Sequence, residues 1–387
     1  MIGAGYAGAT AAKYLRLWAP AIDVTLIERN DAFTSCPLSN LVLGGSKTLG
    51  DITASYRGLE KYGLKLVRDE ALDVDPVKRS VRVRTGSTLD YDRLIVAPGV
   101  DFMYETLAGL ASAEARSRVL HAWKAGSETA ALRRQLEAMP DGGVFALHVP
   151  RAPYRCAPAP YERACQVAFY FKQSKPKSKV LVLDANEDVQ AEKALFTAAW
   201  NGAYKGMVEY RPNSELVDVD ARTLTAKLEF EDVRADALNV VPPQKAGTIA
   251  GRMGLITAND RWCGINWLTM ESIRIPGVHV LGDATLAAPV MPKAGQMANQ
   301  HAKVCAAAVI ALMTNQPVDP NPMLTNTCYS FVDDKNAGHI VTVHAYDAAQ
   351  QTMVVLKGSS DVSNAANELD GAHAMSWAKD IWADMLG

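Results

Sequence analysis

The stretch Met1-Ile2-Gly3-Ala4-Gly5-Tyr6-Ala7-Gly8 carries its glycines in the spacing G-x-G-x-x-G, and an alanine-rich, helix-forming segment follows it directly. Gly3 permits a tight turn, Gly5 lets a pyrophosphate approach the backbone, and Gly8 lets the helix pack closely on a strand. The free N–H groups and the dipole of that helix favour the same negative charge. Residues 1–8, with Tyr6 and Ala7 inside the turn, are therefore predicted to bind a dinucleotide.

An acidic residue at the expected distance supports this prediction. The segment 24–27 is predicted as a strand, and it ends in Glu28, 20 residues after Gly8. A carboxylate in this place accepts hydrogen bonds from ribose hydroxyls, and we include the neighbouring Arg29 in the predicted site. Because only Met1 and Ile2 precede the first glycine, we expect that the sequence is truncated or processed upstream.

The composition is that of an ordinary globular protein, with 387 residues, 49% hydrophobic and 21% charged. This length suggests two or three domains. The net charge of −2 and the lack of a basic run argue against a nucleic-acid partner. No apolar run is long enough to predict a membrane span. The six cysteines form no C-x-x-C pair and no cluster with zinc-ligand spacing, so no metal site is predicted.

Strand and helix signals alternate along the chain, which indicates α/β units around parallel sheets. A second βαβ unit begins with a strand over 143–149, but Pro150-Arg151-Ala152-Pro153 replaces the glycine turn. Prolines lack amide donors, so this unit is not expected to bind NAD(P)H. The predicted fold is α/β, with two Rossmann-like dinucleotide-binding domains plus a C-terminal α+β domain. Their predicted bounds are 1–115 with 245–316 for the first, 116–244 for the second and 317–387 for the third.

Two further strand ends suit a flavin. The strand over 91–96 ends in Ala97-Pro98-Gly99, a second place where the backbone can approach a bulky cofactor. Another strand ends in Gly282-Asp283, and this carboxylate is predicted to accept a hydroxyl of a flavin's ribityl chain. FAD is therefore the predicted cofactor.

A long helix is predicted from about 296 to 313, directly after Lys293 and Gly295. Its N-terminus would point at the flavin pyrimidine and stabilise negative charge on the reduced ring. Lys293 would offset the same charge, although an ordinary surface lysine is an alternative interpretation.

Together with five further stretches, these motifs resemble the flavoprotein subunit of flavocytochrome c sulfide dehydrogenase, within the superfamily of flavoproteins that have two dinucleotide-binding folds. The resemblance covers essentially the whole chain. The stretches are Thr34 to Asn40, His121 to Gly126, Arg155 to Ala164, Pro242 to Gly247 and Asn326 to Ser330.

The resemblance implies roles for four residues. Cys36 matches the cysteine that forms a thioether to a methyl group of FAD. Cys156 and Cys328 match the pair that forms a redox-active disulfide over the flavin, and Glu162 matches an acid near the substrate. From the residues alone, Cys36 could equally be a buried thiol, Glu162 could be a solvated acid at a helix start, and the pairing of the cysteines stays open.

Other side chains near these positions have simpler interpretations. Arg155 and Arg163 either attract an anion or pair with acids, and the second is favoured. Cys165, Cys263 and Cys305 are expected to be inert buried thiols.

The implied activity is the oxidation of hydrosulfide. The anion attacks one sulfur of the disulfide, leaving a persulfide and a thiolate, and two electrons pass to the flavin and then singly to a c-type haem. The chain has no C-x-x-C-H motif, so the haem must lie on a partner cytochrome subunit in a heterodimer. A periplasmic location is also implied, with the export signal upstream of Met1. Which cysteine is attacked does not follow from the sequence.

Three other functions stay open. A sulfide:quinone oxidoreductase would need a C-terminal amphipathic anchor. The segment 375–386 has Trp377, Ile381 and Met385 on one face, but it carries one lysine against two aspartates, unlike a membrane-surface helix. The missing second glycine turn argues against an NADH-dependent flavin reductase. A non-catalytic flavin-carrying subunit would bind FAD without being bleached by sulfide.

Overall fold

The computed structural model describes residues 1–387. The glycine turn at the N-terminus directly follows Ile2, which belongs to a parallel sheet. Ile2 forms parallel bridges to strands on both sides, to Ile27 in β1 and to Val96 in β8. One further strand extends the sheet beyond each of them, because β4 pairs with β1 and β20 pairs with β8, both in parallel. The bounds are β1 Thr25–Glu28, β4 Lys65–Arg68, β8 Leu94–Val96 and β20 Val278–Val280.

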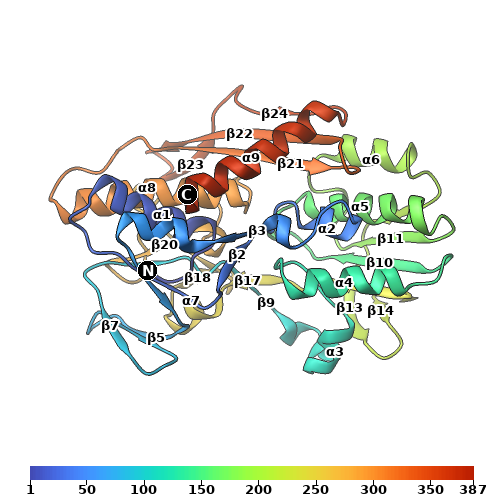
Figure 1. Cartoon of the computed structure of the whole chain (residues 1–387), viewed down its shortest axis with the longest axis horizontal. Coiled ribbons are helices and arrows are strands. Elements are labelled where there is room, and N and C mark those ends of the chain that lie inside the picture. The colour runs from blue at the N-terminus through green and yellow to red at the C-terminus, as the bar shows by residue number, and fades with distance from the viewer.

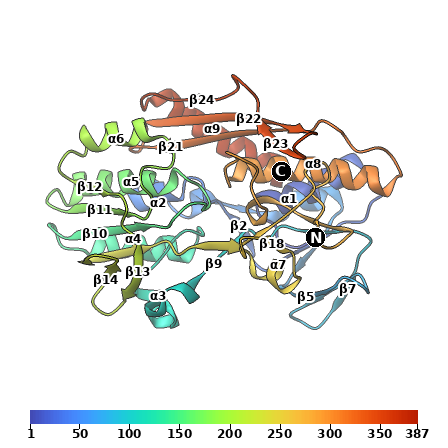
Figure 2. The same cartoon turned by 180° about the vertical axis from the view of Figure 1, so that it is seen from behind.

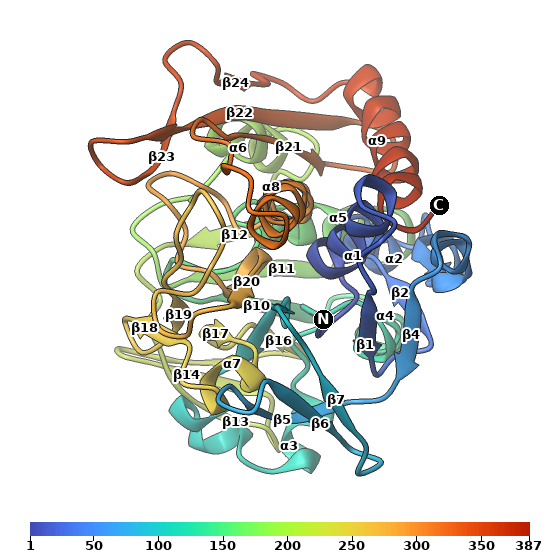
Figure 3. The same ribbon diagram turned by 90° about the vertical axis from the view of Figure 1, so that its left-hand side faces the viewer.

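Two helices, α1 (Tyr6–Trp18) and α8 (Gly295–Met313), lie side by side over this sheet (Figure 3). Small residues in both helices, among them Ala11 in α1 and Ala302 in α8, are fully buried in the shared core. Small side chains let the helix axes approach closely. An antiparallel sheet of β5 (Ala71–Asp75), β6 (Ser80–Val83) and β7 (Thr88–Asp90) completes the first half.

The second half is a four-stranded parallel sheet in the order β12-β11-β10-β16. Its two central strands, β10 (Val144–Val149) and β11 (Lys179–Asp184), are almost entirely buried, as expected for strands covered on both faces. The other elements are β12 Val208–Arg211, β16 Ala237–Val240, α4 Ser127–Ala138, α5 Ala159–Ser174 and α6 Lys193–Asn201, with an antiparallel sheet of β13 Leu216–Asp220, β14 Thr225–Leu228 and β15 Asp232–Arg234.

The C-terminal segment forms a sheet and a helix that lie across both halves (Figures 1 and 2). Strand β21 (Met323–Phe331) pairs with β22 (Ala337–Asp347), which also pairs with β23 (Thr352–Val355) and β24 (Asp361–Val362). The final helix α9 (Glu368–Leu386) packs on α1, where the Lys13 ammonium donates to the Ala383 carbonyl at 2.9 Å. The predicted α/β fold with two Rossmann-like halves and an α+β C-terminal part is therefore confirmed.

The chain crosses between the halves through two antiparallel strands, β9 (Val100–Phe102) and β17 (Gln244–Ala246). A third crossing comes from α2 (Ser39–Gly44), which packs against α4 and α5 of the second half (Figure 1). No helix has the length and hydropathy to cross a membrane. The remaining elements are β2 Ala32–Thr34, β3 Thr53–Ser55, α3 Ala113–Arg118, α7 Thr248–Arg252, β18 Ile256–Ala258 and β19 Trp262–Cys263, with short 3-10 turns.

Candidate functional site

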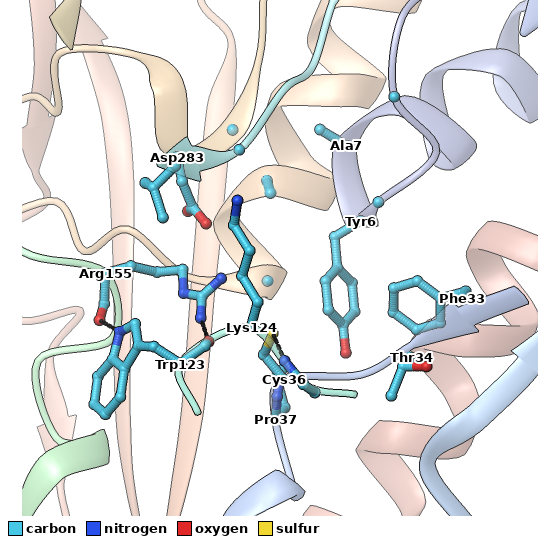
Figure 4. Close-up of a pocket in the computed structure, with 18 of the residues that line it drawn as sticks. Tyr6, Ala7, Phe33, Thr34, Cys36, Pro37, Trp123, Lys124, Arg155 and Asp283 are labelled. Atoms are coloured by element: carbon cyan, nitrogen blue, oxygen red, sulfur yellow. Dashed lines mark hydrogen bonds between the residues drawn. The ribbon is translucent and has the colours of Figure 1, made fainter. Parts of the chain in front are cut away.

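A cavity of about 860 Å³ lies where the two halves and the C-terminal sheet meet. Its volume is in the range of cofactor pockets. All of the predicted site residues except Gly8 line it, which brings together the glycine turn, the three cysteines of interest, Glu162 and Asp283. Figure 4 shows part of this cavity, with Cys36 between Arg155 on one side and Tyr6 and Phe33 on the other.

The three glycines of the turn have different surroundings. A side chain at Gly3 (φ +89°) would place its Cβ 2.4 Å from the Ala97 carbonyl oxygen, and one at Gly8 would place it 1.8 Å from the Gly3 carbonyl oxygen. Gly5 has no atom within 4 Å of such a position. Gly3 and Gly8 are therefore required by packing, whereas Gly5 leaves open the space that a pyrophosphate needs.

Glu28 is buried at the end of β1, with both carboxylate oxygens accepting hydrogen bonds. One oxygen accepts from the Ala4 amide at 2.8 Å, and the other accepts from the Asn30 amide at 2.8 Å and from its side chain at 2.6 Å. These bonds fix the carboxylate beside the turn. Arg29, in contrast, has 60% of its side chain exposed and lies 3.4 Å from Glu70 at the rim.

Asp283 provides a test of whether a flavin fits this cavity. Its Oδ1 atom is buried and has no hydrogen-bond partner, although buried carboxylate oxygens are normally paired. Burial raises the pKa of Asp283, and the nearby Arg155 and Lys293 oppose that shift. A ribityl hydroxyl would supply the missing donor, so the residues present fit FAD.

Lys293 is buried rather than exposed at the surface. Its ammonium lies 3.7 Å from the centre of the Trp262 ring and donates to the carbonyl oxygens of Asp283, at 3.0 Å, and Thr285. Burial lowers the pKa of Lys293 to about 8. The interpretation as an ordinary surface lysine is wrong, because Lys293 is buried and lines the cavity.

Cys36, Cys156 and Cys328 come from three different parts of the fold. Cys36 lies between β2 and α2 and its sulfur accepts from the Ala125 amide at 3.4 Å, whereas Cys156 precedes α5 and Cys328 lies on β21. The structure has all of them as free thiols. Burial raises the pKa of Cys328 to about 12, and burial together with the neighbouring Cys328 and Glu162 raises the pKa of Cys156. These neighbours place Cys156 and Cys328 together, while their disulfide stays a prediction.

Glu162 joins three parts of the molecule by hydrogen bonds. It lies on α5, and its carboxylate accepts from the Phe331 amide of β21 at 2.9 Å and from the Asn40 side chain of α2 at 2.7 Å. It is 8% exposed, so the interpretation as a solvated acid is wrong. Burial raises the pKa of Glu162, although these two donors oppose the shift.

The two arginines differ. Arg163 is buried and donates to Asn40 and Asn239 side chains and to the carbonyl oxygens of His121 and Ala122, at 2.7–3.0 Å. The expectation that it pairs with acids is therefore wrong, because its hydrogen bonds all go to neutral oxygens.

Arg155 donates to the Trp123 carbonyl oxygen (Figure 4). Burial lowers the pKa of Arg155, but Cys36, Asp283 and Cys156 outweigh burial and leave it raised. Arg155 is thus a cation held among two thiols and a carboxylate.

Sequence reasoning missed two polar residues of this region. Asn40 contacts both Glu162 and Arg163, and the only signal for it was its place at the end of the stretch 34–40. Ser330 lines the cavity two residues after Cys328. Cys165, Cys263 and Cys305 are buried outside the cavity, as expected of structural thiols.

These features define a flavoprotein of the class with two dinucleotide-binding folds. The family model of the pyridine nucleotide-disulphide oxidoreductases matches residues 1–133. The model of the central part of the sulfide dehydrogenase [flavocytochrome c] flavoprotein chain matches residues 129–242, and the model of the flavin-binding part of flavocytochrome c sulphide dehydrogenase matches residues 320–386. The chain belongs to the family of the flavocytochrome c sulfide dehydrogenase flavoprotein chain, a family of sulfide-oxidising flavoproteins, and FAD is supported as its cofactor.

One relative carries the name of this family, and two others are sulfide:quinone oxidoreductases. The sulfide dehydrogenase [flavocytochrome c] flavoprotein chain of Chlorobaculum thiosulfatiphilum is 52% identical over 42 residues, which are 11% of this chain and 88% of that sequence. The mitochondrial sulfide:quinone oxidoreductase of Mus musculus is 22% identical over 74% of this chain, which spans 65% of the length of that relative. The sulfide:quinone oxidoreductase of Aquifex aeolicus has the same fold, with a TM-score of 0.78 and 17% identity over 99% of this chain and 90% of that one.

Proposed function

We propose that this chain is the flavoprotein of a sulfide dehydrogenase: it oxidises hydrosulfide at a Cys156–Cys328 disulfide and passes the electrons through FAD, attached at Cys36, to the c-type haem of a cytochrome partner. The observation that carries the proposal is that all three cysteines and Glu162 line one cavity together with the dinucleotide turn. The proposal includes a periplasmic location and the domain division at about residues 115, 244 and 316.

The cavity supplies a cation for an anionic substrate. The Arg155 guanidinium, which lies near Cys36, Asp283 and Cys156, is charged at any physiological pH. A positive charge beside the sulfurs attracts hydrosulfide and stabilises any thiolate formed there. Arg155 is therefore assigned to substrate binding, a role that its neighbours support and that Arg163, bonded to neutral oxygens, does not share.

The chemistry at the cysteines is a thiol–disulfide exchange. Hydrosulfide forms a new S–S bond to one cysteine, and the Cys156–Cys328 bond breaks to leave a persulfide and a thiolate. Bound FAD would supply an acceptor of two electrons, whereas a haem accepts one electron at a time. The charge of Glu162 acts on both Cys156 and Cys328 by raising the pKa of each thiol, and its ionised form is held by Asn40 and Phe331. Its charge disfavours a second anion, so it favours the protonated form of whichever sulfur is not reacting.

Two measurements test the proposal. After acid denaturation the yellow flavin should stay attached to the polypeptide of the native protein. In Cys36→Ser the flavin should separate from the polypeptide. Added sulfide should bleach the flavin of the native protein, and Cys328→Ser should abolish the bleaching. Cys305→Ser is the matched control, since Cys305 is buried outside the cavity and should leave both results unchanged. Flavin reduction at the native rate in Cys328→Ser would refute the mechanism.

A second candidate differs only in the electron acceptor. Relatives that cover most of this chain include sulfide:quinone oxidoreductases, which favours a quinone as the alternative. Helix α9 argues against the membrane anchor that a quinone reductase would need, because Ile381 and Met385 are buried against the rest of the chain. Steady-state turnover with sulfide should proceed with a soluble c-type cytochrome and not with a short-chain quinone. The opposite preference would replace the proposed acceptor.

A further inference from the structure

Glu192, outside the cavity, has an unusual conformation for the residue that precedes a helix. It lies at the N-cap of α6 in the left-handed region, with φ 53° and ψ 37°, and its side chain caps no helix N–H group. An acid at an N-cap normally bonds the first amides of its own helix, and a left-handed backbone is costly for a residue other than glycine. An acid at this position therefore does not stabilise the start of α6.

The carboxylate of Glu192 is directed instead at the redox strand β21. Its Oε2 atom accepts from the Ser330 hydroxyl at 2.5 Å, and its Oε1 atom is buried without any partner. Glu192 is 7% exposed and Ser330 is 1% exposed. A buried carboxylate oxygen with no donor is rare, and here it belongs to an acid whose only hydrogen-bond partner lines the cavity.

The fold brings Glu192 and Ser330 together through a glycine. Ser330 pairs in the sheet with Gly338 of β22, and a Cβ at Gly338 would lie 2.8 Å from the Leu195 side chain of α6. Absence of that side chain lets the first turn of α6 approach the sheet. Cys328 and Ser330 are two residues apart on one strand, so their side chains share a face, and both line the cavity.

Charged and polar groups face Glu192 from four elements. Burial is the main effect that raises its pKa, to about 7, and Ser330 of β21 opposes it. Glu162 of α5 and Asp370 of α9 raise the pKa further, whereas His339 of β22 lowers it. Glu192 in turn raises the pKa of Cys328. The charge state of Glu192 is thus linked to the redox thiol.

We propose that Glu192, acting through the Ser330 hydroxyl, accepts the proton that hydrosulfide loses when it is oxidised in the cavity. The proposal rests on the proposed function. The persulfide R–S–S–H gives its proton to the Ser330 oxygen while the proton of Ser330 passes to Oε2, leaving R–S–S⁻ and a neutral Glu192. No electrons move in this step. The hydrogen bond between Ser330 and Glu192 reverses direction, and because Ser330 is the one donor to Oε2, this displaces no other donor.

Rapid mixing of the FAD-loaded protein with sulfide across a range of pH tests the relay. Ionisation of sulfide affects every variant equally, so the ratio of the native rate to the Glu192→Gln rate is informative. We expect this ratio to be near one at about pH 5. It should reach at least about tenfold at about pH 8, where Glu192 is ionised and its removal takes away a proton acceptor. Ser330→Ala should give the same ratio, and Glu192→Asp should recover part of the rate. Glu187→Gln, an exposed acid just before α6, is the matched control and should give a ratio of one.

A ratio of one at every pH for both Glu192→Gln and Ser330→Ala would overturn the relay. Ser330→Ala removes no charge, so it decides the matter if Glu192→Gln does not fold. A ratio that is large but independent of pH would also overturn it, because a structural defect would slow the reaction at every pH.

A second measurement needs neither sulfide turnover nor flavin. In the reduced protein, alkylation of Cys328 followed by peptide mass spectrometry reports its thiolate fraction. Removing the Glu192 charge should speed this alkylation above about pH 7, where Glu192 is ionised, and leave it unchanged at lower pH. If sulfide fails to bleach the native protein but this difference is present, the proposed function fails while the link between Glu192 and Cys328 stands. If the difference is absent, the proposal is overturned whatever the activity.

Discussion

Replacing Glu192 with glutamine should make the stability of the protein less dependent on pH. Burial raises the pKa of Glu192 from 4.5 to about 7, so between these values the folded state holds a proton that the unfolded state has lost. The stabilisation is complete below about pH 4.5 and is lost as the pH rises through about 7. Glutamine does not titrate, so the unfolding free energy of the variant should not show this decrease with rising pH.

The size of the effect follows from the shift. Each pKa unit corresponds to about 1.4 kcal/mol, and between about pH 5 and pH 8 the native protein should lose about 2.5 kcal/mol more unfolding free energy than Glu192→Gln. Urea unfolding at several pH values, followed by tryptophan fluorescence, measures the difference. Any constant cost of the substitution cancels, because only the change with pH is compared. Parallel curves for the two proteins would refute the argument that the folded state raises the pKa of Glu192 to about 7.

Three other substitutions have defined outcomes. Gly8→Ala forces a Cβ to within 1.8 Å of the Gly3 carbonyl and should cost at least about 2 kcal/mol, seen as a lower flavin-to-protein ratio; normal loading would contradict the packing role. Arg163→Met leaves the side-chain oxygens of Asn40 and Asn239 and the Ala122 carbonyl oxygen without their donor, while the His121 carbonyl still accepts from Asn239, and should cost at least about 3 kcal/mol in urea unfolding; a loss below about 1 kcal/mol would refute this. Asp283→Ala, in a Cys36→Ser background, should weaken FAD binding about tenfold or more in a fluorescence titration, and unchanged affinity would show that Oδ1 does not bind the ribityl chain.

The parts of the site that sequence predicts well are those that depend on local geometry. The turn at Gly3, Gly5 and Gly8 needs only a few consecutive residues, and Glu28 follows at a fixed distance set by one βαβ unit. Asp283 follows the same logic at the end of another strand. In each case the chemistry is determined by the position of a residue at the end of a strand, and the end of a strand can be recognised from the pattern of apolar residues.

The parts that sequence could not predict depend on contacts between distant segments. Arg163 bonds Asn40 and Asn239, which lie 123 and 76 residues away, and nothing in the sequence near Arg163 indicates neutral partners rather than acids. Ser330 and Glu192 are 138 residues apart. Glu192 lies in an ordinary polar stretch before a helix, and its conformation and burial are set by how α6 meets the C-terminal sheet.

The C-terminal sheet has a larger part in the site than carrying one cysteine. Strand β21 supplies Cys328, the Ser330 hydroxyl and the Phe331 amide that binds Glu162. Glu162 also bonds Asn40 of α2, so one carboxylate ties together the first half, the second half and the sheet. Cys156 and Cys328 come from different members of this group, so the bonds of Glu162 constrain their separation, and the proposed disulfide requires a narrow range of separations. In the proposed relay, the same strand connects the sulfurs to Glu192 through the Ser330 hydroxyl.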